Sequence, residues 1–448
     1  MKETDIMINT GLLFGANINR SPTSYLENPL SERMLYESEG DTDKTMLLLK
    51  FQAKDTKADI GLLNWFAVHG TSMNNTNLLV SSDNKGYASY LAEKHFNGNS
   101  TLPGRGDFVA AFASTNLGDV SPNTAGAKCI DTGLPCDDKS SSCDGNSLKC
   151  IGSGPGNDMF QSTEMIGEKQ WHYAKTLFDG AKNLLSGKIS SRHSWVDMSN
   201  QEVLLESGEV VKTCSAALGY SFAAGTTDGP GSGQFVQGTV ISNPFFDEVA
   251  GFLSRPSVEE KICQYPKPIL INTGDLSMPY FWDPPTVPIS IFRLGDLFIL
   301  NAPCEFTTMA GRRLRKAIYS TLKEYDIVNG TVTIAGLSNS YVHYVTTYEE
   351  YQVQRYEAAS TLYGPHTLNA FIMNFERILK DLLDGIVSDS DRPPPDLGDD
   401  QLSFVPPVVF DRIGFFERFG GVIDNAKELY LQGQEAQVCL SANRKVSA

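Results

Sequence analysis

The sequence predicts an α/β protein with one large domain, followed by the start of a smaller second one. Short apolar runs typical of strands alternate along the chain with segments whose apolar residues recur at helical spacing. Near residue 388 the sequence changes to SDSDRPPPDLGDDQ, a Pro- and Asp-rich stretch typical of a linker, and short strand-like runs follow it. No internal repeat is visible in the sequence.

The first half of the chain contains two strands and a helix in this pattern. Residues 60–68 (IGLLNWFAV) have the apolar character of a strand, and a polar turn follows them. Residues 86–95 (GYASYLAEKH) then predict a helix, and residues 108–115 (FVAAFAST) predict a second strand. This order is typical of an α/β unit.

The second half contains a hairpin and an amphipathic helix. Residues 287–294 (VPISIFRL) and 296–300 (DLFIL) predict two strands that turn about Gly295. Residues 306–322 predict a helix, because their apolar side chains recur at helical spacing. The apolar positions are Phe306, Met309, Ala310, Leu314, Ile318 and Leu322.

One more strand and helix follow. Residues 331–337 (TVTIAGL) read as a strand. Thr347 and Glu350 are three residues apart and predict a capping box, in which each side chain accepts a hydrogen bond from the other residue's backbone N–H. That box predicts a helix that begins after Thr347 and continues through Tyr356.

Composition excludes some partners. The chain has 37 Lys and Arg against 53 Asp and Glu, a formal charge of -16, which repels nucleic acid phosphates and anionic membrane leaflets. Its 41% hydrophobic content is that of a globular protein. No apolar run reaches the roughly 18 residues of a membrane span, and the start MKETDIMINTG has no hydrophobic signal core. We therefore expect no nucleic acid partner and no transmembrane segment in this chain.

Four cysteines lie seven residues apart in the polar segment CIDTGLPCDDKSSSCDGNSLKC. Two disulfides are favoured over a zinc site held by four thiolates, because structural zinc sites usually bring cysteines in closely spaced pairs. Sequons at Asn19, Asn74, Asn99 and Asn329 add to the indication of an exported glycoprotein. Without a signal peptide, such a chain is expected to lack its beginning.

Polar clusters follow four of the predicted strands. His69 ends the first strand, NLGDVSPN (116–123) follows the second, Glu305 follows the hairpin, and SNSYVHYVTT (338–347) follows the last. Singly, such a histidine is more often a structural residue and such a glutamate a favourable charge at a helix start. Together, at the carboxyl ends of strands, they predict a site. His, Glu and Tyr provide ligands for a zinc ion with an open position, so the pattern predicts a hydrolase.

At these residues the sequence resembles the neutral ceramidases (N-acylsphingosine amidohydrolases). The resemblance implies zinc-dependent cleavage of the amide of ceramide, a membrane lipid, to sphingosine and a fatty acid. It also implies a fold: a large mixed-sheet α/β catalytic domain at 1–387, a linker at 388–400, and the truncated start of an immunoglobulin-like sandwich at 401–448. The matching stretches are INRSPTSYLENP, WFAVHGTSMNNTN, FVAAFASTNLGDVSPN, GPGNDMFQST, ALGYSFAAGTTDGPG, CEFTTMAGRRLR and YVTTYEEYQVQRYEAASTLYGPHTL.

The resemblance also implies roles for single residues. His69, Glu305 and Tyr344 match zinc ligands of the family, and Ser121 matches its catalytic serine. From chemistry alone His343 is the more tempting ligand beside Tyr344, because neutral imidazole is the commoner zinc donor.

Two further matches line the family's substrate site. They are Arg20 and Tyr356. The alternative, purely structural interpretation is a surface ion-pair residue for Arg20 and a core aromatic for Tyr356.

Two mechanisms remain open. A zinc-bound hydroxide attacks the amide, which we prefer, or Ser121 attacks and needs a base nearby that the sequence does not reveal.

The family also implies a disulfide pairing and a location. The expected pairs are Cys129 with Cys143, Cys136 with Cys150, and Cys214 with Cys263, which leaves Cys304 and Cys439 free. The expected location is the secretory pathway (ER or Golgi), the cell surface or the medium, with membrane contact that is peripheral at most.

Family members carry a first zinc histidine upstream of INRSP, which this sequence lacks, so its activity is an open question. Two alternatives to a ceramidase therefore remain. One is a zinc amidase for another N-acyl lipid, and the other is a catalytically impaired lipid-binding or regulatory chain.

Overall fold

The computed structural model describes residues 3–205, 207–387, 390–399, 422–424 and 439–440. The chain divides into two compact units, Met1–Pro394 and Pro395–Ala448. The first unit holds every residue of the predicted site. In the second unit the described strands are β22 (Val422–Asp424) and β23 (Cys439–Leu440), which pair antiparallel. The other residues of the predicted immunoglobulin-like sandwich lie outside the described part of the chain.

The first unit contains a five-stranded sheet with the order β5-β4-β3-β1-β9. Strands β4 and β5 are parallel, and the other neighbours are antiparallel. This parallel pair is the strand, helix, strand unit that the sequence predicts. The strands are β1 (Thr4–Leu12), β3 (Thr45–Ala53), β4 (Asp59–Phe66), β5 (Val109–Ala113) and β9 (Asn183–Leu184).

A second, four-stranded sheet has the order β10-β17-β18-β20. Strands β17 and β18 form the predicted hairpin, and β20 lies parallel to β18. Both sheets are therefore mixed, as expected. The strands are β10 (Ile189–Asp197), β17 (Thr286–Leu294), β18 (Leu297–Asn301) and β20 (Thr331–Ala335).

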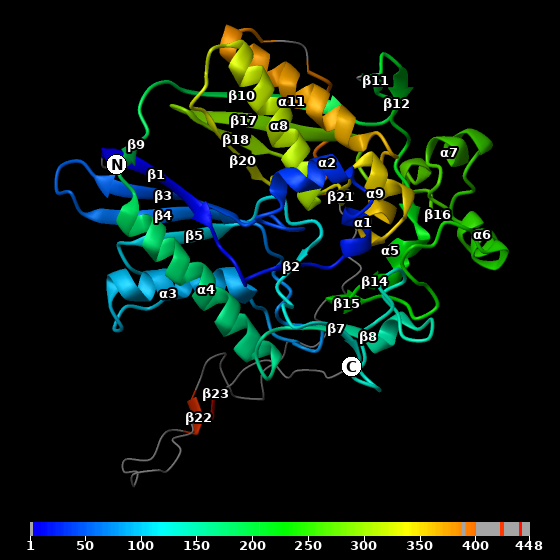
Figure 1. Cartoon of the computed structure of the whole chain (residues 1–448), viewed down its shortest axis with the longest axis horizontal. Helices are drawn as coiled ribbons and strands as arrows, with labels where there is room; N and C mark the ends of the chain where they lie inside the picture. The colour runs from blue at the N-terminus through cyan, green and yellow to red at the C-terminus, as the bar shows by residue number, and fades with distance from the viewer. Residues whose placement is uncertain (1–2, 206, 388–389, 400–421, 425–438, 441–448) are drawn as a thin grey trace. The chain divides into compact units, whose positions relative to one another are not determined.

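The two sheets pack face to face and a pair of helices covers each outer face (Figure 1). Helices α3 (Asp83–Asn97) and α4 (Met159–Gly180) cover the five-stranded sheet. Helices α8 (Thr308–Glu324) and α11 (Thr367–Asp384) cover the four-stranded sheet. The result is a four-layer arrangement of helices, sheet, sheet and helices.

Alternation along the strands explains the layers. In β3, Met46 and Leu48 point to the helices, whereas Leu47 and Leu49 point to the other sheet. Because successive side chains of a strand point to opposite faces, a strand buried on both sides must be apolar throughout. The same alternation occurs in β18, where Leu297 and Ile299 face the five-stranded sheet.

Short elements connect these layers and carry much of the site. Two-residue ladders join β2 to β6 and β19 to β21. These elements are β2 (Ile18–Asn19), α1 (Pro22–Tyr25), α2 (Leu30–Arg33), β6 (Val120–Ser121), β7 (Gly126–Cys129), β8 (Cys150–Ser153), β11 (Glu202–Leu204), β12 (Val210–Lys212), β13 (Leu218–Gly219), α5 (Tyr220–Ala224), β14 (Gly225–Thr226), β15 (Gly229–Pro230), α6 (Pro244–Gly251), α7 (Val258–Cys263), β16 (Ile269–Ile271), β19 (Glu305–Phe306), β21 (Tyr344–Val345), α9 (Tyr348–Gln352) and α10 (Tyr356–Ala359).

The predicted capping box is present, but the predicted helix is shorter than expected. Thr347 and Glu350 exchange both hydrogen bonds of the box at the start of α9. That helix ends at Gln352, so the expected helix through Tyr356 is wrong. Gln354 has a φ of 45°, outside the helical region, and a second helix, α10, begins at Tyr356.

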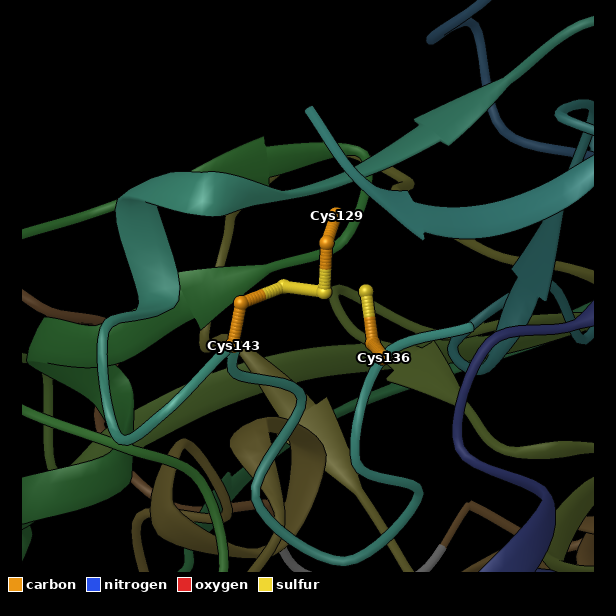
Figure 2. Close-up of side chains that lie close together, drawn as sticks. All are labelled: Cys129, Cys136 and Cys143. Carbon is orange, nitrogen blue, oxygen red and sulfur yellow. A yellow bond between two sulfur atoms is a disulfide. The ribbon is translucent and has the colours of Figure 1, made fainter. Parts of the chain in front are cut away.

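The cysteine-rich loop is held by disulfides, in the pairing that the family resemblance implies. Figure 2 shows the bond between Cys129 and Cys143. Cys129 is bonded to Cys143, and Cys136 to Cys150. The sulfurs of Cys129, Cys136 and Cys143 lie within 4.8 Å of one another, but as disulfide sulfurs they are no thiolate ligands for a metal. A third disulfide joins Cys214 to Cys263, and Cys304 is free and buried.

Two further expectations can be compared with the structure. Among the described residues, no helix is both long and apolar enough to cross a bilayer. Of the four sequons, Asn74, Asn99 and Asn329 are exposed. Asn19 is only 7% exposed, and its amide nitrogen donates to the carbonyl of Asp41 and to Asp119. A glycan on Asn19 would break these contacts, so the burial of this sequon argues against glycosylation at Asn19 in the folded chain.

Leu314 tests the packing of α8 on the four-stranded sheet. Its side chain is fully buried in the core between α8, α11 and that sheet. Leu314→Ala should lower the free energy of unfolding by about 2–5 kcal/mol, because it leaves a cavity. Denaturant unfolding measures this change. The exposed Lys316→Ala on the same helix should change it by less than about 0.5 kcal/mol, and equal effects of the two substitutions would contradict the assignment of the buried face.

Candidate functional site

His69 lies just beyond the carboxyl end of β4, where its backbone and its ring bind the same partner. Its N–H donates to the carbonyl of Val120 at 3.1 Å, and ring atom Nδ1 lies 2.8 Å from that oxygen. A carbonyl oxygen can only accept, so Nδ1 carries the hydrogen. In the neutral imidazole, Nε2 therefore presents a lone pair.

Glu305 and Tyr344 are held opposite that lone pair by a ladder. They are paired in register in the parallel strands β19 and β21. Glu305 Oε2 lies 2.8 Å from His69 Nε2, and the Tyr344 hydroxyl lies 3.5 Å from the same nitrogen. The second carboxylate oxygen of Glu305 accepts a hydrogen bond from the hydroxyl of Tyr341 at 2.7 Å.

Gly118 makes this approach possible. Its N–H donates to the carbonyl of Phe306 at 2.8 Å. A Cβ at this position would lie 2.8 Å from the carbonyl oxygen of Glu305, too close for any other side chain. The glycine of NLGDVSPN thus lets the segment after β5 pack against β19.

These three donor groups fit a cation. A lone pair on Nε2 facing a carboxylate at 2.8 Å is repulsive unless a proton or a cation lies between them. In a tetrahedral zinc site with bonds of about 2.0–2.1 Å, ligand atoms lie about 3.3 Å apart. The separations of 2.8 and 3.5 Å bracket that value. Nitrogen and oxygen donors are also the ligands that zinc accepts.

Burial and charge set the protonation of the site. Burial alone would raise the pKa of Glu305, but a proton between its carboxylate and His69 Nε2, together with the hydroxyl of Tyr341, outweighs burial and lowers that pKa. Burial raises the pKa of Tyr344 well above its usual range, although the charge of Arg20 opposes this. In the structure as it stands, Glu305 is therefore ionised and Tyr344 is neutral at neutral pH.

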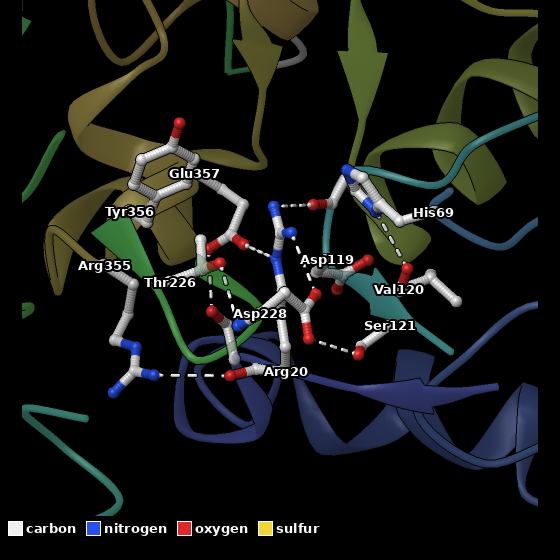
Figure 3. A network of polar contacts seen from close by, with 12 residues as sticks. Arg20, His69, Asp119, Val120, Ser121, Thr226, Asp228, Arg355, Tyr356 and Glu357 are labelled. Atoms are coloured by element: carbon white, nitrogen blue, oxygen red, sulfur yellow. Dashed lines mark hydrogen bonds and ion pairs between the residues drawn. The ribbon is translucent and has the colours of Figure 1, made fainter. Parts of the chain in front are cut away.

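Arg20 joins this cluster to a second one around Ser121 (Figure 3). Its buried guanidinium donates to the Tyr344 hydroxyl at 3.2 Å and to the carbonyl of Gly118 at 2.9 Å. It also forms ion pairs with Glu357 at 2.8 Å and Asp228 at 3.2 Å. Arg20 is thus no surface ion-pair residue.

Ser121 is buried in β6, beside β2, which precedes Arg20. Its hydroxyl donates to Asp228 Oδ1 at 2.5 Å and accepts the backbone N–H of Asn123 at 3.0 Å. Asp228 comes from the turn between β14 and β15, far away in the sequence. Asp228 is therefore a candidate for the base that a nucleophilic serine would need, which the sequence alone does not reveal.

Tyr356 and His343 lie at the edge of the cluster. The ring of Tyr356 packs edge to face on Tyr344, with centroids 5.4 Å apart, and lies beside the guanidinium of Arg20. His343, the ligand that chemistry alone favours, contacts Asp283 at 3.5 Å instead of Glu305. Its carbonyl accepts the N–H of Glu305, which is a backbone role.

The disulfide-bonded loop also supports the site. Arg355, which precedes Tyr356, donates to the carbonyls of Asp138 and Lys139 at 2.5 and 2.7 Å. It also donates to the hydroxyl of Ser141 at 2.6 Å. These contacts fix the cysteine-rich loop to the start of the helix that carries Tyr356.

Comparison with known proteins shows the family of the chain. The family model "Neutral/alkaline non-lysosomal ceramidase, N-terminal" matches residues 1–373. The chain belongs to the neutral/alkaline non-lysosomal ceramidase family. It also has the mixed α/β fold of that family: the crystal structure of neutral ceramidase from Pseudomonas aeruginosa superposes with a TM-score of 0.75 at 34% identity, over 98% of this chain and 61% of that chain.

Two curated members of the ceramidase family are similar over almost the whole chain. Neutral ceramidase 1 of Arabidopsis thaliana is 43% identical, and the match covers 98% of this chain and 65% of the relative. The neutral ceramidase of Drosophila melanogaster is 43% identical over 96% of this chain and 63% of the relative. The chain thus spans less than two thirds of the length of these relatives.

The structure brings together all six residues singled out from the sequence, and it adds others. Asp228 and Glu357 have no role in the sequence-based prediction, and Tyr341 and Asn123 lie in its polar clusters without a role of their own. The only signal for Asp228 is an isolated acidic residue in the glycine-rich stretch GTTDGPG, whose partner cannot be read from spacing.

Asp119, next to this cluster, gives a pH-dependent prediction. It is buried and accepts hydrogen bonds from the backbone and hydroxyl of Thr308, at 2.7 Å each. Burial, then the charge of Glu350, raises its pKa to about 7, against about 3.9 in the unfolded chain. The folded state therefore binds the proton more tightly, and this stabilisation, complete below about pH 4, is lost as the pH rises through about 7.

Asp119→Asn should remove this pH dependence. Between pH 5 and 8 the free energy of unfolding of the wild-type chain should fall by about 2.5 kcal/mol more than that of the variant. Chemical unfolding at several pH values measures the difference. The exposed Asp144→Asn is the matched control and should follow the wild type. Parallel curves for wild type and Asp119→Asn would show that Asp119 is ionised throughout.

Proposed function

We propose that the protein hydrolyses the amide bond of ceramide to sphingosine and a free fatty acid, at a zinc ion held by His69, Glu305 and Tyr344. The observation that carries the proposal is the contact of 2.8 Å between His69 Nε2 and a carboxylate oxygen of Glu305. A zinc ion between these two groups would remove the repulsion between them. The chain also belongs to the family of the neutral/alkaline ceramidases. Ceramide as substrate rests on that family.

The residues of this chain have distinct parts in the proposal. When bound, zinc polarises a carbonyl and lowers the pKa of a bound water to about 7. Val120 holds His69 in the tautomer that presents Nε2, and Tyr341 orients the carboxylate of Glu305. Tyr344 completes the proposed ligand set through its hydroxyl, which lies 3.5 Å from His69 Nε2.

Arg20, Ser121 and Tyr356 form the substrate side. Arg20 places its charge 3.2 Å from the Tyr344 hydroxyl, where it stabilises negative charge that develops nearby. Ser121 is the proposed catalytic serine, and we favour a role in binding the substrate over attack on it. Tyr356 offers an apolar ring at the edge of the cluster, suited to a lipid.

The wider organisation is proposed on the same basis. Residues 1–387 form the catalytic domain, residues 388–400 a linker, and residues 401–448 the start of an immunoglobulin-like domain. Three disulfides support folding in the secretory pathway, because thiols stay reduced in the cytosol. Contact with membranes is then through the lipid substrate.

Loss of the carboxylate ligand tests the zinc site. Glu305→Gln should abolish sphingosine release from ceramide and weaken zinc binding by at least about 10- to 100-fold, and added zinc should restore part of the activity. The bound zinc and the released sphingosine are measured on the same protein samples. The exposed Glu202→Gln should leave both unchanged. Ceramide left intact by the zinc-loaded protein would reject the function, and a panel of other N-acyl lipids would then identify another amidase or a chain that only binds lipid.

The role of Ser121 can be tested separately. If Ser121 attacks the amide, a burst of sphingosine should precede the steady state whenever deacylation is slow, and Ser121→Ala should remove it. We expect slower turnover of Ser121→Ala and no burst in the wild type. An acyl group on Ser121, trapped by rapid quenching and found by mass spectrometry, would contradict this expectation.

A further inference from the structure

We propose that Asp228 is a positioning residue that fixes Ser121 as a hydrogen-bond acceptor toward the substrate. The inference rests on the proposed function. It adds to that function the kind of substrate group that Ser121 binds, which is a hydrogen-bond donor. It is carried by the contacts of Asp228, a residue that the sequence leaves without a role. No other described carboxylate bonds to the Ser121 hydroxyl.

Three groups fix the carboxylate of Asp228. Its Oδ1 accepts from Ser121 Oγ at 2.5 Å and from the Asn123 side chain at 2.8 Å, and its Oδ2 accepts from Arg20 at 3.2 Å (Figure 3). Its backbone N–H donates to the hydroxyl of Thr226 at 3.2 Å. Asp228 is 8% exposed. Both oxygens are therefore engaged, and the side chain has a single orientation.

This arrangement decides what Ser121 can offer a ligand. A serine hydroxyl has one hydrogen and two lone pairs. Asp228 takes the hydrogen, and the backbone N–H of Asn123 takes one lone pair. One lone pair is left, so Ser121 can accept a hydrogen bond from the ligand but cannot donate one to a carbonyl. Ser121 thus suits the amide N–H or a hydroxyl of an N-acyl amino alcohol.

The charge balance shows that neutralising Asp228 need not unfold the chain. The single positive charge of Arg20 is paired with two buried carboxylates, Asp228 and Glu357. Asp228→Asn leaves one carboxylate for one guanidinium, and it removes the charged acceptor of the Ser121 hydroxyl. Glu357→Gln changes the same charge balance, but Glu357 bonds to Ser21 instead of Ser121. It is therefore the matched control.

A double-mutant cycle tests whether Asp228 acts through Ser121. Asp228→Asn should lower kcat for ceramide by about 10- to 100-fold, as expected for a hydrogen bond to a charged group. In the Ser121→Ala background the same substitution should cost no more than about threefold, whereas Glu357→Gln should cost the same in both backgrounds. Asp228→Glu should recover part of kcat. A full loss from Asp228→Asn in the Ser121→Ala background would overturn the proposal.

A second readout does not need ceramide hydrolysis. A cavity of about 140 Å³ is lined by Ser121, Asp228, Arg20 and Asn123, and a thiol at position 121 would face it. In Ser121→Cys, the negative charge of Asp228 should raise the pKa of the thiol, measured by the pH dependence of its alkylation with iodoacetamide. Adding Asp228→Asn should move that profile to a pH lower by about one or more, and adding Glu357→Gln should move it less.

An unchanged alkylation profile would overturn the contact between Asp228 and residue 121, whatever the activity of the protein. The expected shift would support the contact even if no amide were hydrolysed. Failure of the positioning role and failure of the proposed function therefore give different results.

Discussion

The site depends on one contact, between His69 Nε2 and Glu305 Oε2, which lie 2.8 Å apart. His69 follows a strand of the five-stranded sheet, and Glu305 follows a strand of the four-stranded sheet. The packing of the two sheets therefore forces together two groups that repel each other without a proton or a cation between them. The hydrogen bond from His69 Nδ1 to Val120 prevents the ring from relieving this by a change of tautomer.

Arg20 extends the consequence of that contact across the site. A buried guanidinium is stable only when it is paired and hydrogen-bonded, and Arg20 is bound by Glu357, Asp228, Gly118 and Tyr344. The same side chain thus connects the proposed metal ligands with Ser121. A substitution that displaces one cluster is therefore expected to change the geometry of the other through Arg20. For this reason no proposed variant removes more than one carboxylate.

The carboxyl ends of strands were the part of the site that the sequence could predict. His69 and Glu305 follow clear apolar runs, and polar residues at such positions stand out. The pattern could not show that two packed sheets, instead of one, bring them together. It could not choose between His343 and Tyr344 either. His343 has a φ of 57°, in the left-handed region that only a few per cent of non-glycine residues adopt, so the sequence could not predict how its side chain is directed.

Asp228 shows why the rest of the site could not be predicted from the sequence. It lies in a short turn, 107 residues from Ser121, and only the folded chain brings the two together. The expected helix through Tyr356 failed for a similar reason, because Arg355 is held by the disulfide-bonded loop, a tertiary contact that overrides local helical preference.

Anomalous diffraction at the zinc edge, from crystals of the protein grown with zinc, tests the central claim most directly. The account predicts one strong peak bonded to His69 Nε2, a carboxylate oxygen of Glu305 and the hydroxyl of Tyr344, at about 2.0–2.2 Å from each. It also predicts that Nε2 and Oε2 move apart from 2.8 Å toward about 3.3 Å. A zinc-saturated crystal with no peak there, and with His69 still in contact with Glu305, would contradict it.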